Sequence, residues 1–248
     1  MDGPQADHDV RFEWGLTGAL AVAQGVDVAV VVDVLSFTTA LSVAADRGIV
    51  VVPYPHGADD AAVAAAQAGA VLAGPRGTPG ALTLSPTSIR DEAPVSRLLL
   101  PSPNGSAICR ALAPIATTVV GASLRNARAV ADWIARENDA ETARIAVVAA
   151  GERWPDGSLR PALEDLWGAG AVLAALEDHD WPGLSPEAAQ AADAYRLVVG
   201  RERGHLLACT SGEELVAAGY DEDVLVAAEV DASVVVPLLS DRGFVAAP

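Results

Sequence analysis

The chain alternates short runs of β-branched residues with Ala-rich stretches of helical length, a pattern typical of α/β proteins. The nearly continuous Val run at 26–35 predicts a strand that is buried on both faces, and the segment 36–48 predicts the helix that follows it. The alternation continues with a predicted strand at 49–55, a helix at 57–69 and a strand at 70–74. This order predicts the core of a parallel sheet.

The second part of the chain extends the same alternation. Strands are predicted at 96–103, 117–122, 143–151, 224–229 and 233–239, and helices at 104–114, 123–138, 162–178 and 185–198. Segments rich in Gly, Pro and polar residues at 74–96 and 151–161 predict loops, and a loop as long as 74–96 is usually either functional or disordered. No repeat or linker interrupts the chain, so we expect one domain over 1–248. Its expected class is a three-layer α/β/α fold with a mostly parallel sheet, either as one compact unit or as two intimate lobes.

Composition excludes several functions. The chain has 16 basic residues, all of them Arg, against 33 acids, which gives a net charge of −17. Phosphate backbones and anionic lipid repel such a chain, so we expect no nucleic-acid or membrane partner. No apolar run reaches the roughly 20 residues that span a bilayer, and the acidic start lacks the basic residues of a secretory signal. We therefore expect a cytoplasmic protein.

An acid at the end of the Val-rich run is the first candidate for chemistry. Ligands of open α/β sheets bind beyond the carboxyl ends of the strands, and Asp33 ends the run VAVVVD. A desolvated acid there suits a magnesium ligand or a nucleophile toward phosphorus; capping of the next helix is an equally good explanation. Ser36, Thr38 and Thr39 follow with hydroxyl and N–H groups at a helix start, which favours anion binding.

Two further turns carry polar residues. Arg76 lies in a Gly-Pro-Arg-Gly segment upstream of Ser85; its guanidinium could bind phosphate or sulfonate through two hydrogen bonds, or could simply face solvent. Asn104, Gly105 and Ser106 form a turn in which Asn104 caps a helix and the next two N–H groups face an anion. Asn-Gly is also a common turn without any further function.

Paired acids open the helix predicted at 162–178. The helix dipole favours Glu164 and Asp165 in the first turn, so capping is the ordinary explanation. The functional alternative divides the roles, because neighbouring helical residues project about 100° apart: one acid binds metal and the other orients water or ligand.

Other common catalytic arrangements are absent from the sequence. The four histidines occur in no paired spacing, which argues against a zinc site and a histidine phosphatase. No GxSxG or GxxxxGK[ST] motif occurs, which argues against α/β-hydrolases and P-loop enzymes. The two cysteines, Cys109 and Cys209, form neither a disulfide framework nor a metal-type spacing.

Taken in order, these turns resemble the 2-phosphosulfolactate phosphatase family from about residue 10 to 246. The segments that carry the resemblance are VVVDVLSFTTAL (30–41), GPRGTPGALTLSPTS (74–88), LPSPNGSAICRAL (100–112), GASLRNARAVADW (121–133), AAGERWPDGSLRPALEDLWGAGAVLAAL (149–176) and a tail with SGEEL, YDEDVLVAAEVD and VVPLL. The resemblance implies a Mg²⁺-dependent phosphatase that cleaves 2-phospho-3-sulfolactate and has the α/β/α fold of that family. It is also consistent with a homodimer, which no sequence feature demonstrates.

The resemblance also implies roles for residues. Asp33, Asn104 and Asp165 are the expected catalytic residues, and Asp33 with Glu164 is the expected Mg²⁺ site. The expected substrate-binding residues are Ser36, Thr38, Thr39, Arg76, Ser85, Gly105, Ser106 and Arg125. The nucleophile is either metal-activated water, which we favour, or Asp33 itself.

One departure bears on the substrate. The family usually has Arg where this chain has Ser36, so a cation that would bind phosphate or sulfonate is lost, and we expect Arg125 to replace it. Three hypotheses follow: a phosphatase of 2-phospho-3-sulfolactate, the same chemistry on a related small acidic phosphomonoester, or a catalytically silent homologue that binds a small anion.

Overall fold

Two parallel half-sheets and a hairpin between them form the centre of the protein. The structure is a computed structural model that describes residues 3–91 and 95–247. The first half-sheet contains β1 (Val10–Trp14), β7 (Ile145–Ala149), β2 (Val28–Val32) and β6 (Thr118–Ala122), and the second contains β3 (Val50–Pro55), β5 (Arg97–Ser102) and β4 (Val71–Leu72). The hairpin of β10 (Pro237–Ser240) and β11 (Gly243–Ala246) joins them into one nine-stranded sheet.

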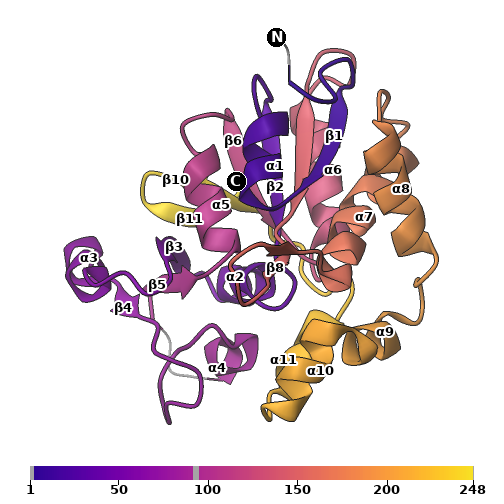
Figure 1. Cartoon of the computed structure of the whole chain (residues 1–248). Helices are drawn as coiled ribbons and strands as arrows, with labels where there is room; N and C mark the ends of the chain where they lie inside the picture. Colours follow the sequence, from indigo (N-terminus) through magenta and orange to yellow (C-terminus); the bar gives the residue numbers. More distant parts are fainter. Residues whose placement is uncertain (1–2, 92–94, 248) are drawn as a thin grey trace.

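The first half-sheet is buried on both faces, which explains its near-continuous Val sequence. All five residues of β2 are buried, and so are all five of β7. Val30 and Val32 face a core shared with α6 (Ala127–Glu137), α7 (Leu163–Asp178) and α8 (Pro186–Arg196). Ala29 and Val31 face the opposite core, with α1 (Gly15–Val22), α2 (Phe37–Asp46) and α5 (Gly105–Leu112). The result is the expected three-layer α/β/α fold with a mostly parallel sheet (Figure 1).

The hairpin reverses the direction of the second half-sheet. β10 pairs antiparallel with β6 through Leu238 and Val120, and β11 pairs antiparallel with β3 through Phe244 and Val51. The prediction that 26–74 forms one parallel core is therefore wrong, because β2 and β3 lie in different half-sheets. Hydrophobic periodicity identifies strands, but it does not show which of them pair.

Twist brings the carboxyl ends of the two half-sheets together. Adjacent strands rotate by roughly 20–25°, so the five steps from β2 to β5 amount to a rotation of about 100–125°. Because β5 also runs in the opposite sense, this rotation lets its end approach the end of β2. The Gly105 N–H at the start of α5 donates a 2.8 Å hydrogen bond to Asp33, directly after β2.

Shorter elements complete the fold around this meeting point. They are α3 (Ala61–Ala68), α4 (Pro86–Asp91), the small hairpin β8 (Glu152–Arg153) and β9 (Leu159–Arg160), and the helices α9 (Glu202–Ala208), α10 (Thr210–Ala217) and α11 (Asp221–Ala227). Figure 1 shows α9, α10 and α11 together below the sheet, and α11 packs against α4. None of the described helices is both long and apolar enough to cross a membrane.

The strand predicted at 224–229 is also wrong, since α11 ends at Ala227 and a turn follows it. Three acids, Asp221, Glu222 and Asp223, occupy the first turn of α11, where the helix dipole favours them. These acids outweigh the strand propensity of the short Val-Leu-Val run behind them.

Candidate functional site

Asp33 is the centre of the site. It lies directly after β2 with 6% of its surface exposed. Its Oδ2 accepts the Gly105 N–H at 2.8 Å and its Oδ1 accepts the Phe37 N–H at 3.2 Å. Burial raises the pKa of Asp33, the hydrogen bonds from Gly105 and Phe37 oppose this shift, and the charge of Glu164 adds to it. An acid held at the junction of two half-sheets, away from water, is a strong candidate for chemistry.

The turn after Asp33 is held by its own hydroxyls. Thr38 Oγ1 accepts the Asp33 N–H at 2.9 Å, and Thr39 Oγ1 donates to the Val34 carbonyl at 2.7 Å. Both threonines are buried. The structure therefore engages the two side chains within the turn, and their contact with substrate stays a prediction.

The Asn-Gly-Ser turn after β5 lies against Asp33. A Cβ on Gly105 would come within 2.6 Å of both Asp33 Oδ2 and Phe37 Cδ1, so only glycine permits this approach. Asn104 occupies the N-cap position of α5, but its side chain makes no capping hydrogen bond. It donates from Nδ2 to Glu152 at 3.0 Å and accepts from Arg153 Nε at 3.1 Å. Ser106 Oγ donates to backbone carbonyls of β3 and β5, so it stabilises the turn.

The paired acids of α7 have different surroundings. Asp165 Oδ1 accepts the Val34 N–H at 2.7 Å and its Oδ2 accepts the Gly151 N–H at 2.8 Å. It thus ties the end of β7 to the turn after β2, although burial and the charges of Asp33 and Glu164 raise its pKa well above the usual range. Glu164 is 2% exposed, and its charge acts on both Asp33 and Asp165. Backbone N–H groups occupy both carboxylate oxygens of Asp165. Among the described residues, the Glu164 oxygens are not both occupied in this way.

Glu152 is a site residue that the sequence analysis missed. Burial, the charge of Asp33 and the charge of Glu164 raise its pKa to about 7, against the hydrogen bond from Asn104. Together with Asn104 and Arg153, it lines an open cavity of about 290 Å³ between α1, α5 and the β8–β9 hairpin. The available signal was its place directly after the predicted strand at 143–151, at the same sheet edge as Asp33, in a segment that the sequence analysis treats as a loop.

Arg76 reaches the start of α2 from the long loop. Its Nη2 donates to Ser36 Oγ at 2.7 Å and forms an ion pair with Asp223 at 3.4 Å. Ser85 Oγ donates to the same carboxylate at 2.5 Å. Arg76, Ser36 and Ser85 are therefore brought together as expected, and Asp223 of α11 is a second residue that the sequence analysis missed. Figure 1 shows why, since α4 and α11 converge from distant parts of the chain.

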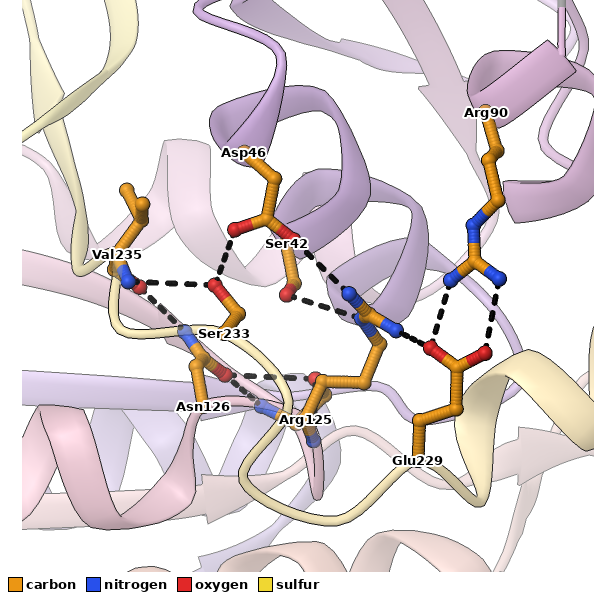
Figure 2. Close-up of polar contacts among 9 residues, drawn as sticks. Ser42, Asp46, Arg90, Arg125, Asn126, Glu229, Ser233 and Val235 are labelled. Carbon is orange, nitrogen blue, oxygen red and sulfur yellow. Dashed lines mark hydrogen bonds and ion pairs between the residues drawn. The ribbon is translucent and has the colours of Figure 1, made fainter.

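Arg125 lies in a separate ion-pair cluster (Figure 2). Its guanidinium donates to Ser42 Oγ at 3.3 Å and to Asp46 at 2.9 Å, both in α2, and also to Glu229. Its side chain is only 5% exposed. The expectation that Arg125 replaces the family arginine is therefore corrected: two carboxylates already neutralise it, and it holds the turn after β6 to α2 and to the segment after α11.

The acids of the site have properties that suit a divalent cation. Asp33, Glu164 and Asp165 are each at least nine-tenths buried, and none forms an ion pair within 3–91 and 95–247. No set of three His, Cys, Asp or Glu side chains in those residues has the arrangement of a metal site. Mg²⁺ often needs only one or two carboxylates, with water and substrate phosphate completing its shell. Asp33 and Glu164 fit that smaller requirement, and Asp165 fits a bracing role.

Comparison with known proteins assigns the chain to a family. No protein of curated function matches it significantly. The sequence profile described as 2-phosphosulpholactate phosphatase matches residues 19–242, which include the turn at Asp33, the long loop, the Asn-Gly-Ser turn, the paired acids and α11. The family consists of phosphoric monoester hydrolases. On this match over nearly the whole chain, the protein belongs to the 2-phosphosulpholactate phosphatase family.

Proposed function

We propose that the protein is a Mg²⁺-dependent phosphatase that hydrolyses 2-phospho-3-sulfolactate or a related small acidic phosphomonoester. The observation that carries the proposal is the buried Asp33 carboxylate where the ends of β2 and β5 meet, with Glu164 acting on it electrostatically. Family membership supplies the reaction class.

Asp33 and Glu164 would hold the cation. When bound, Mg²⁺ would neutralise the phosphate and stabilise the charge that develops on the transferring phosphoryl group. Asp165 accepts short hydrogen bonds from the Val34 and Gly151 N–H groups, and these two bonds fix the backbone beside Asp33. Gly105 and Phe37 orient the Asp33 carboxylate through their N–H groups.

Glu152 is the group suited to proton transfer. General acid–base catalysis works best when the pKa of the group lies near the working pH. Burial, the largest cause of the raised pKa of Glu152, does not depend on the charges of Asp33 and Glu164 that the cation would neutralise. Glu152 can therefore take a proton from attacking water or give one to the departing oxygen. The Asn104 amide holds its Oε2 at 3.0 Å. We favour water as the nucleophile, because Asp33 already accepts two backbone hydrogen bonds and would serve as a cation ligand.

Arg76 would bind the non-reacting anionic group of the substrate. Its Nε is buried and has no hydrogen-bond partner among the described residues, so an acceptor oxygen from a ligand would satisfy it. Because Arg76 Nη2 reaches Ser36, its cationic group lies at the position where the family usually has arginine.

A panel of phosphomonoesters with and without Mg²⁺ tests the proposal. We expect Asp33→Asn to lower kcat/KM by roughly 10²- to 10⁴-fold, because it removes charge from the reacting centre. Asp59→Asn, a change at an exposed acid before α3, is the matched control and should retain wild-type activity. Chelation of the metal should abolish turnover.

Two outcomes would contradict parts of the proposal. Wild-type activity no greater than that of Asp33→Asn on every compound, with ligand stabilisation independent of Mg²⁺, would favour the silent anion-binding homologue. Labelled phosphate trapped covalently on the protein during turnover would overturn water as the nucleophile.

A further inference from the structure

We propose that Asp223 of α11 is a positioning residue for substrate recognition, because its carboxylate fixes the long loop and holds Arg76 for the second anionic group of the substrate. The proposal rests on the proposed function and deepens it by naming what orients the recognition arginine.

Asp223 is a buried acid that contacts two residues of the loop between β4 and α4 and one residue in the first turn of α4. It is 1% exposed. Its Oδ1 accepts the Ser85 hydroxyl at 2.5 Å and the Thr87 N–H at 3.3 Å. Its Oδ2 accepts from Arg76 Nη2 at 3.4 Å. One carboxylate thus connects the loop to the start of α4, through residues that are up to eleven positions apart.

The loop has little regular structure of its own to orient Arg76. Outside α4, residues 74–85 form only the isolated bridge between Gly74 and Thr83. The guanidinium of Arg76 lies 5.4 Å from the ring centre of Tyr220, which directly precedes α11. The start of α11 therefore supplies both a carboxylate and an aromatic face to the arginine, an arrangement that orients a guanidinium.

Two groups beside Asp223 lack partners in a way that indicates a ligand. Arg76 Nε and Thr87 Oγ1 are buried, and neither has a hydrogen-bond partner among the residues that the structure describes. Unpaired buried donors carry a free-energy cost that a bound acceptor removes. A sulfonate or carboxylate oxygen is such an acceptor, and Asp223 leaves Nε of the arginine unoccupied while it engages Nη2.

A second carboxylate near α11 provides a matched control. Glu229 binds Arg90 of α4 at 2.7 Å and also binds Arg125, so it too links α4 to the chain after α11 (Figure 2). Its hydrogen bonds involve neither Arg76 nor Ser85. Loss of Glu229 therefore weakens the same packing without releasing the recognition arginine.

The test compares two substrates in Asp223→Asn and Glu229→Gln. For 2-phospho-3-sulfolactate, which has a second anionic group, Asp223→Asn should raise KM by roughly 10- to 100-fold, the effect of one charge-assisted interaction. Its KM for phenyl phosphate, which has none, should stay at the wild-type value. Glu229→Gln should leave both KM values unchanged. Equal changes for the two substrates in Asp223→Asn, or the same selectivity change in Glu229→Gln, would overturn the proposal.

Two further measurements keep the result interpretable. If Asp223→Asn does not fold, Ser85→Ala releases the same carboxylate from the loop side and should show the same selective rise in KM. If the wild type turns over neither substrate, the proposed function fails but positioning can still be measured. In that case 3-sulfolactate should raise the melting temperature of the wild type and not that of Asp223→Asn; an equal rise in both proteins would overturn positioning.

Discussion

At the scale of single residues, the close approach of Gly105 to Asp33 is the most demanding contact of the site. We expect Gly105→Ala to lower kcat/KM by about 10²-fold, since misplacing a reacting group by about 1 Å has effects of that size. The added Cβ would meet Asp33 Oδ2 and Phe37 Cδ1, each at 2.6 Å, and must displace one of them. Steady-state kinetics with the preferred substrate provides the measurement.

Gly204→Ala in α9 is the matched control for that substitution. Apart from its own neighbours in the helix, no atom of the described residues would lie within 4 Å of a Cβ at Gly204. This variant should retain activity and gain roughly 0.5–1 kcal/mol in the free energy of unfolding, because alanine favours the helix. Wild-type kinetics in Gly105→Ala would mean that Asp33 tolerates displacement and is not the centre of the chemistry.

At the scale of elements, the β10–β11 hairpin joins the two half-sheets and packs against the start of α2, just after the turn that follows β2. Phe244 of β11 is buried and packs edge-on against Phe37, with ring centres 6.4 Å apart. We expect Phe244→Ala to lower the free energy of unfolding by about 3–5 kcal/mol through the cavity that it leaves. Activity should fall as well, since Phe37 donates its N–H to Asp33. Urea denaturation and kinetics measure the two effects.

The corresponding control is Phe244→Leu, which keeps most of the buried volume and should lose less stability and less activity. A Phe244→Ala variant as stable as Phe244→Leu would show that packing of Phe244 on Phe37 does not stabilise the junction of the half-sheets.

The elements also show what the sequence could and could not predict. The runs at 26–35 and 143–151 were identifiable because strands buried on both faces need continuous apolar residues. Strand β1 was missed because the sequence Val-Arg-Phe-Glu-Trp is short and interrupted by charge. The hairpin at the C-terminus was missed as the link between half-sheets, since pairing of strands far apart in the chain leaves no local pattern.

At the scale of the whole molecule, the site is assembled from segments more than 130 positions apart. Asp33 and Gly105 could be named because one lies near the end of a predicted strand and the other just after one. Asp223 could not, because its role depends on α11 packing beside a distant loop. Glu152 had one signal, its place just after a predicted strand, but its raised pKa depends on the distant acids Asp33 and Glu164. The net charge of −17 is the sequence feature that led us to predict a cation at the site, because the expected substrate is an anion.

The raised pKa of the buried Glu152 carboxyl predicts how the stability of the protein depends on pH. The pKa of Glu152 is raised from 4.5 to about 7, so its protonated form is favoured in the folded state. Its contribution to stability is therefore present below about pH 4.5 and is lost as the pH rises toward 7. In metal-free protein we expect Glu152→Gln, which cannot ionise, to gain stability relative to the wild type over that interval. Urea denaturation across the interval measures the difference.

Magnesium should reverse the loss, because a cation binds ionised carboxylates and competes with protons. We expect Mg²⁺ to raise the urea midpoint of the wild type more at about pH 8 than at about pH 5. Asp33→Asn should lose this response, because it removes one of the two proposed ligands, whereas the exposed-site variant Asp59→Asn should keep it. A response to Mg²⁺ in Asp33→Asn equal to that of the wild type would place the cation elsewhere in the protein.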